Sequence, residues 1–193
     1  MKIALIGPGV ISIPPPGWGA VEILIWDYYN QLKELGHQVD IINPLRRNPR
    51  ESSTPNCKYI RNLIQEINRG NYDFVHVHYD VLYHILDKIK AEKIGITSHY
   101  PYIDQIEKHR GDGYSNIFNF LIKNNKYYNF VLADKDKETL IKHGVNNKFI
   151  FKLKNGINSN KFKFYKIPTF YNMSIYLGKI DERKKQYKYQ NIK

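Results

Sequence analysis

The first 22 residues of the chain, MKIALIGPGVISIPPPGWGAVE, restrict the fold more than any other segment does. Residues 3–6 are apolar and predict a buried strand, a loop rich in glycine and proline follows, and an amphipathic helix is predicted to begin at Ala20. A strand that leads through a glycine-rich loop into a helix is how α/β proteins present backbone N–H groups to a phosphate. This beginning predicts an α/β fold with a phosphate or sugar-phosphate loop.

The spacing of the glycines argues against a dinucleotide site. Gly7 and Gly9 are not followed by a third glycine three residues later, so the G-x-G-x-x-G fingerprint is absent. A second pair, Gly17 and Gly19 with Trp18 between them, stands directly before the helix and after three prolines. We interpret these three residues as a loop that lets a bound diphosphate or sugar approach the backbone. The alternative is an ordinary turn stiffened by the prolines.

Strand and helix patterns alternate along the rest of the chain. Further strands are predicted at residues 39–42, 74–77, 94–97, 128–133 and 149–153, and helices at residues 20–35, 59–68, 81–90 and 135–143, with a mostly helical segment up to residue 123. The apolar face predicted for the helix at residues 20–35 consists of Val21, Leu24, Ile25, Tyr28, Leu32 and Leu35. Such alternation implies parallel β-α-β crossovers, so we expect a doubly wound, Rossmann-like parallel sheet over residues 1–157.

The end of the sequence begins a second unit. Residues 158–172 are predicted to be a linker, and an apolar strand at residues 173–177 is followed by a charged, helix-like stretch. Residues 173–193 therefore predict the first β-α unit of a second domain, which a lone strand and partial helix cannot complete. Lys179, Arg183 and Lys184 follow that strand, where cations would suit a diphosphate leaving group; a solvated lysine-rich tail is the equal alternative.

Bulk composition excludes several classes of protein. No apolar run approaches the ~20 residues of a membrane-spanning helix. Cys57 is the only cysteine, which excludes an internal disulfide and favours a cytoplasmic setting. The net charge of +12 indicates either a solvated basic surface or an anionic partner, such as a nucleotide-sugar or a phospholipid surface. Because no nucleic-acid-binding motif is present, we expect no nucleic-acid partner.

Three histidines are candidates for a site. His76 and His78 alternate in FVHVHYD, which places both side chains on one face of a strand. A two-histidine metal site would lack completing carboxylates or cysteines, so burial with a hydrogen bond is favoured; His78 lies nearer the carboxyl end of the strand, where ligands bind. His99 follows the strand at residues 94–97 and precedes Tyr100, again at that edge. Position alone leaves its functional and structural roles equally open.

Six segments in order and spacing resemble the N-terminal half of family 4 glycosyltransferases, which are retaining enzymes of the GT-B fold; the segments are IPPPGWGAVE, FVHVHYD, ITSHYP, VLADKDKETLIKHGV, KNGIN and YLGKIDERKKQ. The resemblance implies transfer of a sugar from a nucleotide-sugar donor to a glycan or lipid-linked acceptor, without a metal or other cofactor. By the same resemblance, His99 is the active-site histidine that contacts the transferred sugar. Gly17 and Gly19 correspond to the loop beside the donor diphosphate, and Lys179 and Lys184 to its phosphate-binding cations.

The chain also departs from the family pattern. Lys179 stands where the family usually has arginine, which keeps the charge but loses the bidentate geometry, and Lys185 replaces a glycine. Most of the second domain, which holds the donor nucleotide, is missing, so we expect little or no activity from this chain alone. Acceptor choice is expected to lie in loops 43–56 and 102–115.

Other functions fit the sequence as alternatives. The chain is then a non-catalytic module that binds an acceptor or a partner, a sugar-nucleotide epimerase, or a basic protein that binds membranes peripherally or nucleic acid. The sequence also leaves open three kinds of interaction: contact with a membrane surface, assembly into an oligomer, and pairing with a separate C-terminal half.

Overall fold

A computed structural model describes residues 1–44 and 57–156 of the chain. This part forms a seven-stranded sheet in the order β3-β2-β1-β4-β5-β6-β7, with every neighbouring pair parallel. The strands are β1 (Lys2–Ile6), β2 (Gln38–Pro44), β3 (Cys57–Ile60), β4 (Phe74–Val77), β5 (Lys93–Thr97), β6 (Tyr128–Val131) and β7 (Ile150–Lys152). The α-helices are α1 (Ala20–Glu34), α2 (Leu63–Gly70), α3 (Tyr114–Lys123) and α4 (Asp134–Lys142). Short 3-10 helices are η1 (Asp80–Lys88), η2 (Ile103–Gln105), η3 (Arg110–Asp112) and η4 (Asn147–Phe149).

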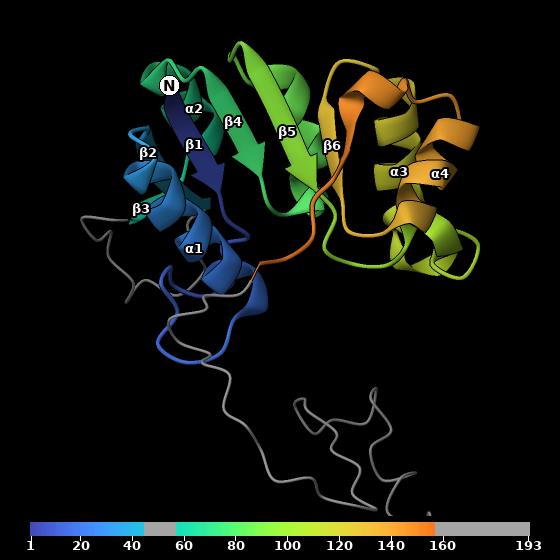
Figure 1. Cartoon of the computed structure of the whole chain (residues 1–193), viewed down its shortest axis with the longest axis horizontal. Helices are drawn as coiled ribbons and strands as arrows, with labels where there is room; N and C mark the ends of the chain where they lie inside the picture. The colour runs from blue at the N-terminus through green and yellow to red at the C-terminus, as the bar shows by residue number, and fades with distance from the viewer. Residues whose placement is uncertain (45–56, 157–193) are drawn as a thin grey trace, which may run out of the picture. The chain divides into compact units, whose positions relative to one another are not determined.

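The order of the strands reverses at β1, which pairs with β2 on one side and with β4 on the other. Figure 1 shows β1, β4 and β5 side by side and pointing the same way, with α1 in front of the sheet. The predicted doubly wound, Rossmann-like α/β sheet is therefore confirmed. In such a sheet the crevice outside the carboxyl ends of the strands, at the point of reversal, is where ligands bind.

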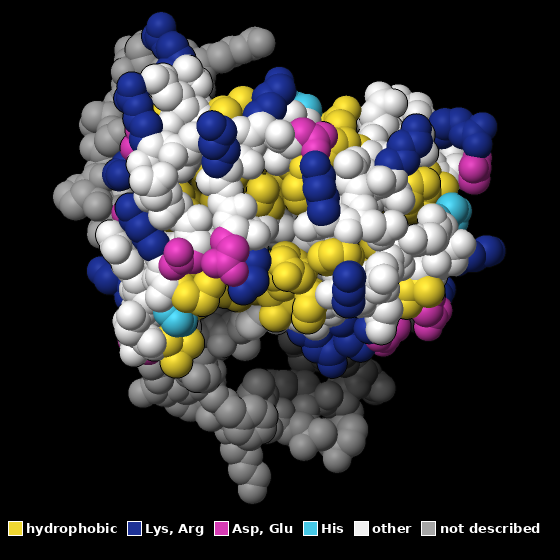
Figure 2. Space-filling model, turned by 90° about the horizontal axis from the view of Figure 1, so that it is seen from above, with side chains coloured by type: hydrophobic (Ala, Val, Ile, Leu, Met, Phe, Trp, Pro, Cys, Tyr) yellow, Lys and Arg dark blue, Asp and Glu magenta, His cyan; other side chains and the backbone are white. Residues whose placement is uncertain are grey.

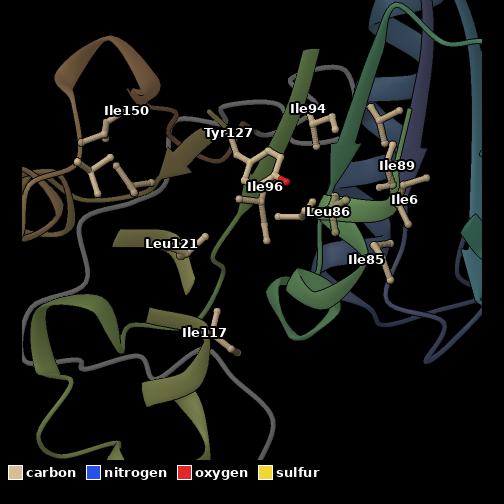
Figure 3. Close-up of a cluster of buried hydrophobic side chains, with 14 of the residues drawn as sticks. Ile6, Ile85, Leu86, Ile89, Ile94, Ile96, Ile117, Leu121, Tyr127 and Ile150 are labelled. Atoms are coloured by element: carbon tan, nitrogen blue, oxygen red, sulfur yellow. The ribbon is translucent and has the colours of Figure 1, made fainter. Parts of the chain in front are cut away.

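The two faces of the sheet are covered differently. Helix α1 packs on one face with a cluster that includes Leu5, Ile25 and Ile41. The other face carries the larger cluster, built from α2, η1, α3 and α4 against the strands, and Figure 3 shows part of it around Ile96 and Leu121. Burying these aliphatic side chains is the main stabilising contribution to the fold.

Helix α1 begins and ends close to where the sequence predicts, and of its predicted apolar face Ile25 is buried while Val21, Tyr28 and Leu32 pack partly buried against the same cluster. Its buried residues are Glu22, Ile25 and Tyr29, which repeat at helical spacing. Leu35, predicted to face inward, is 72% exposed because it caps the helix just before Gly36 turns the chain away. The prediction for Leu35 is wrong.

The segment at residues 59–68 is not one helix. Strand β3 (Cys57–Ile60) pairs in parallel with β2, so Ile60 belongs to the sheet edge and not to a helix face. Helix α2 starts only at Leu63, because the Asn62 side chain accepts a hydrogen bond from the Gln65 N–H at 3.3 Å and caps it. The predicted helix at residues 81–90 is likewise a 3-10 helix, η1.

All of these elements belong to one unit of the chain, Met1–Asn158. The predicted linker at residues 158–172 and the predicted second-domain segment at residues 173–193 lie outside the described residues. No helix in the described part is long and apolar enough to cross a membrane. Figure 2 views the end of the sheet where the strands begin; there lysine and arginine side chains stand singly among acidic and hydrophobic ones, without forming one basic patch.

Candidate functional site

The loop after β1 is held by a side chain of the neighbouring strand. Asn43 in β2 is fully buried, and its Oδ1 accepts a hydrogen bond from the Gly9 N–H at 3.1 Å while its Nδ2 donates to the Ile11 carbonyl at 3.4 Å. A Cβ on Gly7 would collide with that amide group. Gly7 is thus required so that Asn43 can reach the loop, and the start of the loop is fixed by internal hydrogen bonds.

The predicted Gly17–Trp18–Gly19 loop divides into a structural and an open part. Gly19 has φ 149° as the residue before α1, and its carbonyl accepts from the Ile23 N–H at 2.8 Å. A Cβ there would press on Ile11, so the fold itself demands this glycine. Gly17 is exposed with no atom within 4 Å of where a Cβ would stand, and Trp18 is 74% exposed. The part of the loop that is open to a ligand is therefore Gly17 and Trp18, beside the positive end of the α1 dipole.

The three candidate histidines lie together at the carboxyl ends of β4 and β5. The rings of His76 and His78 share one face of β4 with centroids 3.9 Å apart, and the His78 ring lies 5.9 Å from that of His99 at an interplanar angle of 18°. His76 Nε2 is 2.7 Å from the Thr97 Oγ1, so this ring is fixed by β5. Tyr28 of α1 contacts the His78 ring with centroids 5.4 Å apart, which connects the helix that begins at the glycine loop to the histidines.

Several buried polar atoms at this edge of the sheet have no hydrogen-bond partner within the described part of the chain. They are both ring nitrogens of His78, Nε2 of His99 and Oδ2 of Asp80. Buried polar atoms in folded proteins are nearly always hydrogen-bonded. Buried polar atoms without hydrogen-bond partners at the carboxyl edge of the sheet therefore indicate a place where a ligand or ordered water can bind.

The histidines are neutral at physiological pH. Burial, and secondarily the neighbouring His99, lowers the pKa of His76 to about 3. Burial lowers the pKa of His99 to about 4, and burial with the two other histidines holds the pKa of His78 well below its usual value. A neutral imidazole offers one donor and one acceptor, so these rings suit sugar hydroxyls better than phosphates.

Asp80 was not among the sequence-predicted residues. It is buried at the start of η1, close to the hydroxyls of Tyr102 and Ser98. Burial raises its pKa, and the two hydroxyls act in the opposite direction. Its place at the end of FVHVHYD, just beyond a predicted strand, was the sequence signal that could have identified it.

The remaining predicted residues are not placed. Lys179 and Lys184, predicted to bind the donor phosphates, lie outside the described residues. Within the ranges that the structure describes, no group of three or more histidines, cysteines or acidic residues could hold a metal ion. The structure thus brings His78 and His99 together, and the expected phosphate-binding residues of the site lie outside the described residues.

Comparison with known proteins gives a match at the level of fold. No protein-family model matches the sequence, and no curated protein matches it. Among solved structures, the lipopolysaccharide outer core galactosyltransferase WaaB is similar with a TM-score of 0.57 and 16% identity, over 81% of this chain and 46% of WaaB. Anabaena HepE in complex with UDP-glucose is similar with a TM-score of 0.50 and 13% identity, over 86% of this chain and 47% of HepE.

The chain therefore shares the fold of GT-B glycosyltransferases. It spans less than half the length of these two relatives. At such identities the similarity concerns the fold, and the chemistry has to be argued from the site.

Proposed function

We propose that this chain is the acceptor-side domain of a retaining, family 4 glycosyltransferase that transfers a sugar from a nucleotide-sugar to a glycan or lipid-linked acceptor. The fold is shared with a galactosyltransferase and with HepE, which binds UDP-glucose. The observation that carries the proposal is the pair His78 and His99, because both ring nitrogens of His78 and Nε2 of His99 are buried without partners in the described part of the chain. Six sequence segments in family order add to it.

In the proposed reaction the bond between the sugar C1 and the diphosphate oxygen breaks, and the diphosphate leaves with the electron pair. The acceptor hydroxyl oxygen forms the new bond to C1 on the same side, and its proton passes to the departing diphosphate oxygen. His99, kept neutral by its low pKa, hydrogen-bonds to a hydroxyl of the transferred sugar. Gly17 leaves room for the diphosphate beside the amino end of α1.

The donor side of the site is proposed to come from a second domain. Lys179 and Lys184 would begin it and neutralise the departing diphosphate, since cations placed where charge develops lower the barrier. The relatives are about twice as long as the part of them that this chain matches. We infer that the chain alone has weak or no transferase activity.

A turnover assay tests this proposal. Release of nucleoside diphosphate is measured with a panel of nucleotide-sugars and acceptors, for this chain and for a version extended through a full second domain. The extended version is expected to be active, and His99→Ala is expected to lower its kcat/KM by about 100-fold through loss of a hydrogen bond to the reacting sugar. His84→Ala is the control, because His84 is exposed on η1 and bonds only the Val81 carbonyl in the described contacts, at 3.2 Å.

Two results would contradict the proposal. Full activity of the short chain would remove the need for a second domain. If the extended version binds acceptor glycans but neither binds nor turns over any nucleotide-sugar, the protein is a binding module derived from this fold.

A further inference from the structure

One aromatic ring is left open on the residue that follows His99 in the chain. Tyr100 follows His99 in the loop after β5 and is 45% exposed. Its ring stacks on Tyr114 of α3, with centroids 5.0 Å apart and an interplanar angle of 17°. Tyr114 in turn stacks on Tyr102, with centroids 4.5 Å apart and an angle of 28°. Three tyrosine rings thus form a stack whose outermost member reaches solvent.

This stack is anchored in the carboxyl ends of the sheet. Tyr102 is fully buried, and its hydroxyl lies 3.1 Å from the Ser98 Oγ at the end of β5. Asp80, just beyond β4, lies close to both hydroxyls. The outer ring therefore rests on a hydrogen-bonded and packed support, so little conformational entropy is lost when a ligand stacks on it.

A fourth ring lies beside the stack and leaves its outer face uncovered. The His109 ring is perpendicular to both neighbours, with its centroid 5.1 Å from that of Tyr100 and 6.1 Å from that of Tyr114. Because these two distances are similar, His109 must flank the stacked pair; a ring on the far face of Tyr100 would be much farther from Tyr114. We assign the exposed area of Tyr100 to the face turned away from Tyr114.

The chemistry of this position fits a sugar ring. A pyranose has an apolar face of C–H bonds, which stacks on the electron-rich face of an aromatic ring, and a rim of hydroxyls. The segment that carries His109 is polar, since Glu107 and Arg110, its near neighbours in the sequence, are exposed and form an ion pair. A lipid chain would instead need a continuous apolar groove.

We propose that Tyr100 is the stacking platform for a pyranose ring of the acceptor, and that the acceptor is recognised here by a sugar and not by a lipid chain. This inference rests on the proposed function, because it names the acceptor class of the same site. It also moves acceptor recognition to the edge of loop 102–115, where the sequence predicted it in general terms.

The test is sugar binding by the whole chain without any donor. Saturation-transfer NMR is recorded with methyl β-galactopyranoside, methyl β-glucopyranoside and methyl α-mannopyranoside. At least one should receive saturation on its ring C–H protons, and Tyr100→Ala should weaken its binding about fivefold or more. Tyr100→Phe should bind as the unchanged chain does, because the ring is kept. Phe151→Ala is the matched control, since Phe151 is equally exposed at 45% but lies on β7.

Other outcomes overturn the inference. They are an absence of saturation transfer from the unchanged chain to all three sugars, equal binding by Tyr100→Ala, or equal losses in Tyr100→Ala and Phe151→Ala. Binding to phosphatidylglycerol vesicles that depends on Tyr100, without sugar binding, would make the ring a lipid contact instead. Thermal unfolding of each variant shows that it is folded. If the extended version does not turn over any nucleotide-sugar but the chain still binds a sugar through Tyr100, the proposed function is wrong and the sugar platform stands.

Discussion

The two ends of the strands in this sheet differ in how their polar side chains are hydrogen-bonded. At the amino ends, Asp73 accepts a hydrogen bond from the Lys2 backbone N–H at 2.7 Å, and the Tyr127 hydroxyl donates to Asp87 at 2.5 Å. At the carboxyl ends of β4 and β5, both ring nitrogens of His78 are buried without a partner in the described part of the chain. These side chains at the first end are paired, and His78 at the second is not.

This difference separates stability from ligand binding. Paired groups contribute to folding, whereas a buried group without a partner costs free energy unless a ligand or water satisfies it. Even at the carboxyl end the contrast is local, because both amide atoms of Asn43 in β2 are hydrogen-bonded, whereas ring nitrogens of His78 and His99 are not. These unpartnered ring nitrogens lie at the carboxyl ends of β4 and β5, the edge of a parallel sheet where ligands bind.

The largest expected effect is acid destabilisation through the histidines. The pKa of His76 is lowered to about 3 and that of His99 to about 4, and that of His78 is lowered as well. Between the ordinary histidine pKa and these values the unfolded chain binds more protons than the folded one. The free energy of unfolding should therefore fall as the pH drops below about 6.5, by up to about 4 kcal/mol per pH unit if all three titrate together.

Urea unfolding at a series of pH values measures this slope. The Asp87 interactions at the amino ends should not contribute to this slope between about pH 5 and 6.5. Lys126 and Tyr127 lower the pKa of Asp87, so its interactions with them weaken only at more acidic pH. His78→Leu should reduce the slope by about a third, since it removes one of the three groups. A free energy of unfolding that stays constant down to about pH 5 would mean that the cluster is solvated and not buried.

The second effect separates the two glycines of the loop. Gly19→Ala should lower the free energy of unfolding by about 1–3 kcal/mol, because φ 149° strains a residue with a side chain. Gly17→Ala should change it by less than about 0.5 kcal/mol, because its Cβ meets nothing within 4 Å. Thermal or urea unfolding of both variants gives the comparison. Equal losses would show that Gly17 is also fixed by the fold and is not the open part of the loop.

The sequence predicted the sheet far better than the state of its polar atoms. Strand β4 has the predicted bounds, Phe74–Val77, and the alternation of His76 and His78 correctly places both on one face. These features follow from local periodicity, which the sequence states directly. Strand β3 was missed because the Asn62 cap and the pairing with β2 override a helical spacing of apolar residues.

The site depends on contacts between distant segments, which periodicity does not encode. The support of Tyr100 by Tyr114 and Tyr102 joins α3 to the end of β5, and Asp80 in η1 lies close to Tyr102. Likewise, no local pattern distinguishes Gly17 from Gly19, since only the packing against Ile11 and the backbone angle separate them. The roles carried over by resemblance, such as that of His99, stay predictions.

The smallest expected effect is that substitutions at the two ends of the strands change the free energy of unfolding in opposite directions. Tyr127→Phe removes the hydrogen bond to Asp87 and should lower the free energy of unfolding at neutral pH by about 1 kcal/mol. His78→Leu replaces a buried ring without a partner by an apolar side chain of similar volume, and should raise the free energy of unfolding by about 1 kcal/mol. The same variant should lower acceptor binding or turnover in the extended enzyme, as expected where an open site is kept at the expense of stability. If His78→Leu destabilises the chain at neutral pH, ordered water already hydrogen-bonds to His78. The buried atoms that remain to bind a ligand are then those of His99 and Asp80.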